Sequence, residues 1–153
     1  MVYLTRRYRL SASHRLYNDA LTAEENAHVY GKCANPYGHG HNYVLEVTLV
    51  GPVDPATGMV YDLAVLDELV GREILERFDE SHLNTHEDVF RHLVPTTENF
   101  CLAAFNLLKE KFEPGGRFRQ ARLHRVRVEE TSSNFFECED PGNGRTEEGK
   151  VSG

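Results

Sequence analysis

The sequence predicts an α+β fold in which two helices cover one face of a four-stranded antiparallel sheet. Three observations lead to this prediction. Two segments near the start alternate apolar and polar residues, two central segments repeat apolar residues at helical spacing, and two more alternating segments follow them. Because strands flank the helices on both sides in the sequence, we expect the strands to form one sheet that the helices cover.

The first two strands are expected at residues 3–12 and 43–50, where alternate positions are apolar and share one face. These positions are Tyr8, Leu10, Ala12, Tyr43, Leu45, Val47 and Leu49. Residues 54–58 are rich in turn-forming types, and a short strand at 59–61 is expected to complete a hairpin.

Both helices have recognisable ends. Asp62 can cap a first helix whose apolar residues follow helical spacing as far as Phe78. A second helix is expected to begin near Thr96 and Thr97, whose hydroxyls are suited to capping, and to end before Pro114. Each helix presents an apolar stripe that can pack on the sheet.

The last strands are expected at residues 122–130 and about 134–137. Residues 1–140 therefore make up one domain, and the glycine-rich, charged residues 141–153 are expected to form a disordered tail.

Length, charge and cysteine content exclude several classes of protein for this chain. The 153 residues suit one domain with its own core. A formal net charge of -7 gives no broad basic surface, so we expect no nucleic-acid partner. No run is apolar enough for a membrane span or a signal peptide, which predicts a cytoplasmic protein with no membrane partner. Three widely spaced cysteines argue against a disulfide framework.

Three histidines form a candidate metal site. His39 and His41 lie two residues apart and share the apolar face that Tyr43 continues, while His14 extends the apolar face of the first strand. If the two strands pair antiparallel, the end of one lies beside the start of the other. Three imidazoles without a thiolate leave a fourth position open, as in catalytic zinc sites, although iron or another divalent ion would fit the same ligands.

Two other interpretations compete for these histidines. They could be unrelated surface residues, as an isolated His-x-His often is, but the matching face of His14 favours a metal site. The pattern of His39 and His41 followed by Glu46 also resembles the first metal motif of cupins. Glu46 falls on the opposite strand face, and two substantial helices do not suit a jelly roll.

Two further residues are candidates for chemistry. Cys33 lies in a glycine-rich loop six residues before His39, so its thiol is either an activated base beside the metal or an inert buried group. Glu130 extends the apolar face of its strand and should therefore have a partner. Its carboxylate could accept two parallel N–H bonds from a guanidine-like ring edge, or it could be a surface acid at a strand end.

Four segments together resemble the 6-pyruvoyl-tetrahydropterin synthase and 6-carboxy-tetrahydropterin synthase family. They are SASHRLYNDALTAEENAHVYGKCANPYGHGHNY, DPATGMVYDLA, PTTEN and VEETSSN, and they occur in the order and at the spacing of that family. The resemblance extends over nearly the whole chain up to Asp140.

The resemblance implies specific roles for residues of this chain. It implies that zinc is bound by His14, His39 and His41, that Cys33 is the catalytic base, and that Glu130 anchors the pterin ring. Thr96 and Thr97 match positions that help to bind the pterin. The implied substrate is 7,8-dihydroneopterin triphosphate.

The resemblance also implies an assembly. In the tunnelling fold of this family, strands of three subunits close a barrel, and two trimers stack into a homohexamer with active sites between subunits. We therefore expect a dimer of trimers.

One position departs from the family pattern. Where the family usually has an acid–base pair of aspartate followed by histidine, this chain has Asp79 followed by Glu80. Either His82 or Glu80 itself, with a raised pKa, would have to take the role of the absent histidine. We assign Asp79 and His82 as candidate catalytic residues.

The resemblance leaves three functions to choose between. The chain could be a lyase that eliminates triphosphate to give 6-pyruvoyl-tetrahydropterin, or a 6-carboxy-tetrahydropterin synthase that releases acetaldehyde, as in queuosine biosynthesis. The loop CANPYGHGHNY, with its longer spacing between cysteine and histidines, resembles the pyruvoyl enzymes and favours the first. A zinc- and pterin-binding homologue without catalysis is the third.

Overall fold

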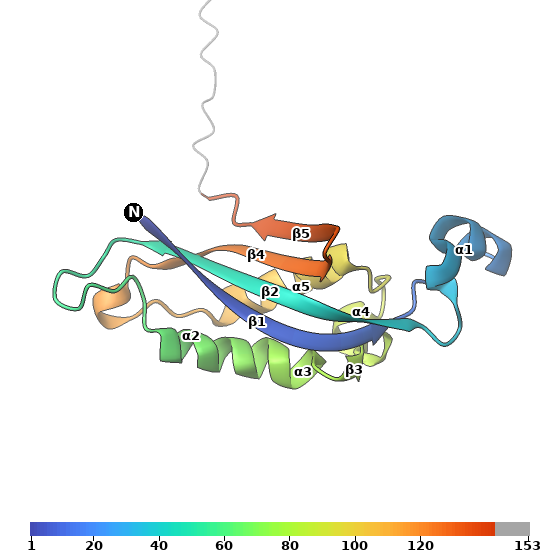
Figure 1. Cartoon of the computed structure of the whole chain (residues 1–153), viewed down its shortest axis with the longest axis horizontal. Coiled ribbons are helices and arrows are strands. Elements are labelled where there is room, and N and C mark those ends of the chain that lie inside the picture. The colour runs from blue at the N-terminus through green and yellow to red at the C-terminus, as the bar shows by residue number, and fades with distance from the viewer. Residues whose placement is uncertain (143–153) are drawn as a thin grey trace, which may run out of the picture.

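A computed structural model describes residues 1–142 and contains one five-stranded sheet with strand order β3-β1-β2-β4-β5 (Figure 1). The strands are β1 (Val2–His14), β2 (His39–Gly51), β3 (Ser81–His82), β4 (Arg122–Thr131) and β5 (Asn134–Glu139). β1, β2, β4 and β5 are antiparallel neighbours, as predicted. The α+β class is confirmed. Residues 143–153, most of the tail expected to be disordered, lie outside the described residues.

Two details of the predicted sheet are wrong. The sheet has five strands instead of four, because β3 pairs parallel with β1 through Ala12 and Ser81 and through Ser13 and His82. A two-residue edge strand is too short to show alternation. Residues 59–61 form no strand, because Asp54 N donates to the carbonyl of Met59 at 2.8 Å and closes a local turn instead.

The pairing of β1 with β2 is the longest in the sheet. It runs from Val2 opposite Gly51 to His14 opposite His39. Alternate residues of both strands face the helices, and on β1 these are at most half-buried as far as Tyr8 and almost completely buried from Leu10 to His14. The two strands therefore hold a fixed register as far as the histidines at their shared end.

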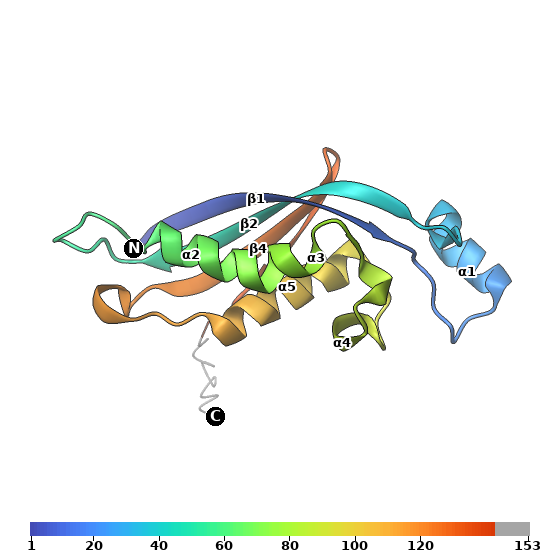
Figure 2. The same ribbon diagram turned by 90° about the horizontal axis from the view of Figure 1, so that it is seen from below.

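Helices cover one face of this sheet (Figure 2). α2 (Leu63–Val70), a π-helical turn (Gly71–Leu75) and α3 (Glu76–Phe78) follow one another directly, and α5 (Thr97–Lys111) packs against β4 and β5. Both predicted helix starts are confirmed: Asp62 accepts a hydrogen bond from Ala64 N at 2.9 Å, and Thr96 accepts one from Asn99 N at 3.2 Å.

Helix α1 (Ala23–Tyr30), which no sequence pattern predicted, lies beyond the ends of β1 and β2 (Figures 1 and 2). A capping box begins this helix, since Glu25 N donates to Thr22 Oγ1 at 3.1 Å and Thr22 N donates to Glu25 Oε2 at 2.7 Å. Short helical turns at α4 (Glu87–Phe90), Leu83–Thr85 and Gly116–Phe118 complete the fold.

The core between sheet and helices is centred on aromatic rings. The Phe100 ring on α5 is fully buried, with its centroid 5.3 Å from that of Phe78 and 5.6 Å from that of Tyr43. These contacts join α5 to the end of α3 and to β2, next to the histidines.

Replacing Phe100 by alanine is expected to lower the free energy of unfolding by about 3–5 kcal/mol, because the ring leaves a cavity in a closed core. Urea denaturation followed by circular dichroism measures the change. Leu102→Ala, on the same helix but 48% exposed, is the matched control and should change stability by less than about 0.5 kcal/mol. Equal losses in the two variants would contradict this packing.

Candidate metal centre and substrate site

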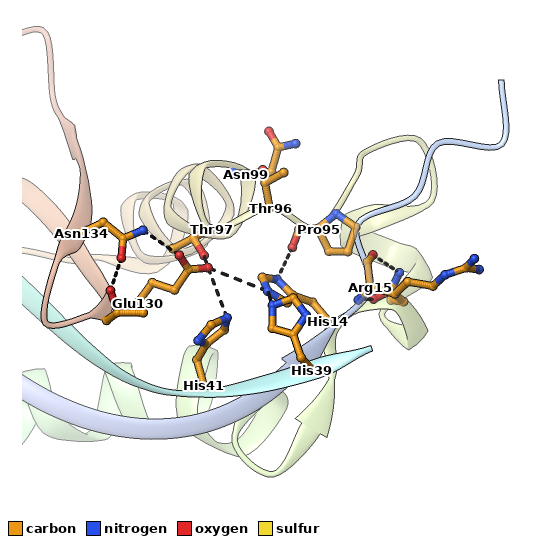
Figure 3. Close-up of polar contacts among 12 residues, drawn as sticks. His14, Arg15, His39, His41, Pro95, Thr96, Thr97, Asn99, Glu130 and Asn134 are labelled. Carbon is orange, nitrogen blue, oxygen red and sulfur yellow. Dashed lines mark hydrogen bonds and ion pairs between the residues drawn. The ribbon is translucent and has the colours of Figure 1, made fainter. Parts of the chain in front are cut away.

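Three imidazoles meet at the shared end of β1 and β2 (Figure 3). His14 and His39 face each other across the last pair of the ladder, and His41 follows two residues later on the same side. One nitrogen of each ring lies within 4.8 Å of the others, and Nε2 of His14 is 3.0 Å from Nε2 of His39. The structure thus brings together the three histidines that strand pairing predicted to converge.

The backbone of Gly38 lies very close to that of His14 at the point where β2 begins. Gly38, immediately before His39, has φ +68°, and a Cβ there would lie 2.8 Å from the carbonyl oxygen of His14. Glycine alone accepts both the left-handed backbone and this contact. The glycine before His39 therefore helps to set the spacing of the ligands.

The ring of His14 is held in one orientation. Its Nδ1 lies 2.8 Å from the carbonyl oxygen of Pro95, just before α5, so Nδ1 carries the proton and the Nε2 lone pair points to the other histidines. Burial lowers the pKa of His14 and of His39, and the neighbouring imidazoles add to this shift. Both rings are therefore neutral near pH 7, as metal binding requires.

These residues fit a divalent metal ion. A tetrahedral ion about 2.0–2.1 Å from each nitrogen would separate the nitrogens by about 3.3 Å, close to the spacing of His14 and His39. Nε2 of His41 is buried and has no hydrogen-bond partner among residues 1–142. A metal would satisfy this atom, and three imidazole nitrogens with an open fourth position are typical of catalytic zinc.

Glu130 lies beside the histidines, and it has the partners that the sequence led us to expect. Its Oε1 accepts a hydrogen bond from Thr97 Oγ1 at 2.6 Å, and its Oε2 accepts one from Asn134 Nδ2 at 2.7 Å. Oε1 is also 3.5 Å from Nε2 of His41 and 3.8 Å from Nε2 of His14. The carboxylate therefore connects the start of α5 to the candidate metal centre (Figure 3).

The charge state of Glu130 follows from these contacts. Burial acts to raise its pKa, but the hydrogen bonds from Thr97 and Asn134 and the nearby histidines outweigh burial and hold the pKa below its usual value. Each oxygen accepts one hydrogen bond from the chain and keeps a lone pair. An ionised Glu130 can thus accept two further N–H bonds from a ligand.

The two neighbouring threonines differ in position. Thr97 contacts Glu130, whereas the hydroxyl of Thr96 caps α5 by accepting from Asn99 N. The role of Thr96 in binding the pterin stays a prediction.

Cys33 lies in the short 3-10 turn Gly31–Ala34 that follows α1. Its carbonyl oxygen accepts from Leu16 N at 2.9 Å, which ties the turn to the chain two residues after His14. Its side chain is half-buried, and it does not belong to the ligand group formed by the three histidines. Its role as the base stays a prediction.

Asp79, Glu80 and His82 lie on the other side of the β1–β2 ladder. Asp79 Oδ1 accepts from Ser11 N at 2.8 Å, and Nδ1 of His82 is 2.8 Å from Ser13 Oγ. Because Ser13 points away from the face that carries His14, one chain does not bring these candidates to its own histidines.

Glu80 and His82 line a shallow hollow of about 430 Å³ on that side. Glu80 has φ +54°, a left-handed backbone that is uncommon outside glycine, and its N–H donates to the carbonyl oxygen of Ser11 at 2.6 Å. The structure therefore presents both possible substitutes for the family's histidine away from the metal face.

Two contacts of the site were not predicted. The Pro95 contact uses a backbone carbonyl, for which side-chain identity gives no signal. Asn134, which donates to Glu130, could have been found from the turn ETSSN, because an amide four residues after a buried carboxylate can fold back on it.

A family model described as 6-pyruvoyl tetrahydropterin synthase matches residues 3–141. The chain belongs to the 6-pyruvoyl tetrahydropterin synthase family. It is 41% identical over 132 residues to a human protein named 6-pyruvoyl tetrahydrobiopterin synthase, covering 86% of this chain and 87% of the relative. An Archaeoglobus fulgidus protein named putative 6-carboxy-5,6,7,8-tetrahydropterin synthase is 35% identical over 99 residues, covering 65% of this chain and 73% of that protein.

The family assignment extends to three-dimensional structure. The solved structure of Caenorhabditis elegans 6-pyruvoyl tetrahydropterin synthase superimposes with a TM-score of 0.82 at 38% identity, over 91% of this chain and 95% of the other. Within residues 1–142, no helix is both long and apolar enough to cross a membrane.

Proposed function

We propose that this protein is a zinc-dependent 6-pyruvoyl-tetrahydropterin synthase, a lyase that converts 7,8-dihydroneopterin triphosphate to 6-pyruvoyl-tetrahydropterin by eliminating triphosphate. The observation that carries the proposal is the convergence of three histidines with the ionised Glu130, whose Oε1 is 3.5 Å from Nε2 of His41. Family membership and 41% identity to the human synthase support the reaction.

His14, His39 and His41 would hold the zinc ion. A zinc ion bound there supplies a Lewis acid that polarises oxygen atoms of the substrate side chain. The remaining catalytic tasks belong to residues of the chain.

Glu130 would bind the guanidine-like edge of the pterin ring through its two remaining lone pairs. Thr97 and Asn134 orient this carboxylate by donating to one oxygen each. Cys33, as a thiolate, would remove a proton from a carbon of the substrate side chain, and Asp79 with His82 would return a proton to another atom of that side chain. The fixed carboxylate determines which substrate carbon faces the base.

Two copies of the chain would be needed to complete one site. Asp79 contacts Ser11 N and lines the same hollow as Arg9 and Ser11, and His82 contacts Ser13 Oγ, so neither is brought to the histidines of its own chain and both would serve the metal centre of another copy. The position of these two residues supports an assembly in which neighbouring subunits share each site. We propose that three subunits form the tunnelling fold and that two such trimers stack into a homohexamer.

Mixing two inactive variants tests the shared site. His39→Ala and Asp79→Ala should each be inactive, whereas assemblies co-expressed with both chains should recover up to about a quarter of wild-type turnover, because random mixing pairs two intact halves at that frequency. Tandem purification with different tags isolates the mixed assemblies. Mixed assemblies as inactive as the single variants would show that each chain contains its whole site.

Mass spectrometry of the products tests the reaction itself. Zinc-loaded protein incubated with 7,8-dihydroneopterin triphosphate should release triphosphate and 6-pyruvoyl-tetrahydropterin. The similarity to the Archaeoglobus protein makes a carboxy product with acetaldehyde the second candidate outcome. Unchanged substrate, with zinc content and assembly verified, would identify a pterin-binding protein without catalysis.

A further inference from the structure

The turn that carries Cys33 lies away from the core of the domain. It follows α1, which lies beyond the ends of β1 and β2 and apart from the helices that cover the sheet (Figures 1 and 2). A catalytic base must lie within hydrogen-bond reach of the proton that it removes. Contacts outside the core must therefore hold this turn in place if its thiol is to act as a base.

Two hydrogen bonds attach the turn to the end of β1. Leu16 N donates to the carbonyl oxygen of Cys33 at 2.9 Å, and Arg15 Nε donates to the carbonyl oxygen of Ala34 at 3.1 Å. The guanidinium of Arg15 also lies over the ring of Tyr17, 4.1 Å from the ring centroid, which restricts its movement. Two successive residues after β1 thus hold two successive carbonyls of the turn.

The side chain of Asn84 holds the backbone of Arg15. Its Oδ1 accepts from Arg15 N at 2.8 Å, and its Nδ2 donates to the carbonyl oxygen of Arg15 at 2.9 Å. β3 pairs with β1 only through Ser81 and His82, and the chain then enters a 3-10 turn. A side-chain amide offers the same donor and acceptor as a peptide group, so Asn84 takes the place of a further backbone pair. One side chain therefore fixes both polar backbone groups of Arg15.

We propose that Arg15 is a positioning residue for Cys33, which it holds against the strand end carrying His14 through the bond to Ala34, and that Asn84 fixes Arg15 for this role. This inference rests on the proposed function, because it assumes that Cys33 is the base. A displacement of about 1 Å at a reacting group can cost about 100-fold in rate. Loss of either supporting side chain would therefore slow proton abstraction and leave the zinc ligands and the ring anchor in place.

Arg15→Met tests the inference, because it keeps an unbranched apolar stem and removes the N–H groups. We expect kcat to fall about 10- to 100-fold. Zinc content and the Kd for 7,8-dihydroneopterin, measured by fluorescence, should stay within about 2-fold of wild type. Hydrogen exchange of residues 31–38 should become at least about 5-fold faster, because the turn loses a bond to the end of β1.

Three results with Arg15→Met would overturn the inference. They are an unchanged kcat, unchanged hydrogen exchange in residues 31–38, and a loss of zinc or of ring binding as large as the loss of kcat. The last of these would show general damage to the site in place of a displaced base.

Asn84→Leu is the second variant, because it removes both bonds to Arg15 with little change in side-chain volume. It should lower kcat and leave zinc content and the Kd for 7,8-dihydroneopterin near the wild-type values. An unchanged kcat would show that Arg15 holds the turn without Asn84. Because Asn84 lies two residues after His82, its effect must also be separated from one on that candidate catalytic residue.

A double-mutant cycle separates these routes. In a Cys33→Ala background, neither Arg15→Met nor Asn84→Leu should lower the remaining rate of triphosphate release by more than about 2-fold, because the group that they position is absent. Single-turnover kinetics measures these rates. Losses as large as in the wild-type background would show that both residues act independently of the thiol and would overturn the inference.

Arg6→Met is the matched control. Arg6 lies on the same strand, and its guanidinium donates to both carboxylate oxygens of Asp67 on α2, at 2.9 and 2.7 Å. Its loss should leave kcat and the exchange of residues 31–38 as in wild type, and an equal fall in kcat would overturn a specific role for Arg15. A wild-type protein that neither binds nor converts the pterin would refute the proposed function, an outcome distinct from an active wild type whose Arg15→Met variant turns over normally.

Discussion

Replacing His39 by alanine is expected to reduce turnover more than ~100-fold and to remove most of the bound zinc. Loss of even an outer partner of a metal ligand costs about 10- to 100-fold in metal affinity or activity, and a direct ligand should cost more. His39 is a better choice than the fully buried His14, because the variant is less prone to misfold. Metal content by mass spectrometry and triphosphate release measure the two effects.

His28→Ala is the control for this variant. His28 lies in α1 and is exposed, so its loss should leave zinc content and turnover unchanged. If His39→Ala retained zinc and activity at the wild-type level, the three histidines would not be the metal site of the enzyme.

Replacing Cys33 by alanine is expected to lower kcat by about 10²–10⁴-fold, the usual contribution of a positioned acid or base. Zinc content should be unchanged, because Cys33 is not one of the three grouped ligands. The Kd for 7,8-dihydroneopterin should also stay near the wild-type value, since Glu130 is the proposed anchor of the ring. Single-turnover triphosphate release, together with metal analysis and fluorescence binding, separates these quantities.

Cys138→Ala is the matched control, because Cys138 is also a partly buried thiol but lies on β5, beside α5. It should keep normal turnover. Full activity in Cys33→Ala would assign the proton abstraction to another residue, and loss of zinc in that variant would place the thiol among the metal ligands.

Much of the fold could be predicted because the spacing of apolar residues along the sequence indicates the long strands and helices. The alternating segments of β1 and β2 gave both the strands and the shared face of the histidines, and Asp62 and Thr96 gave the helix starts. The short elements β3 and α1 were not predicted because they show no clear apolar periodicity. β3 is held by the backbone of β1, and α1 has a capping box but only eight residues, of which only Asn26 is buried.

The convergence of the three histidines at the candidate site could be predicted, but the contacts that orient them and Glu130 could not. His14, His39 and His41 follow from strand parity, which is a local property of the sequence. The contacts of His14 with Pro95 and of Glu130 with Thr97 join residues far apart in the chain, and they depend on where α5 packs. The side on which Asp79 lies depends likewise on the pairing of β3 with β1.

The contact between His14 and the carbonyl of Pro95 has a consequence for the fate of the protein in the cell. His14 belongs to the sheet and Pro95 to the segment that begins α5, so an ion held by His14 would also secure the helix against the sheet. Binding that favours the folded state adds to its stability. Scarcity of the metal would therefore expose more of the chain to proteolysis, and metal supply would set the amount of enzyme as well as its activity.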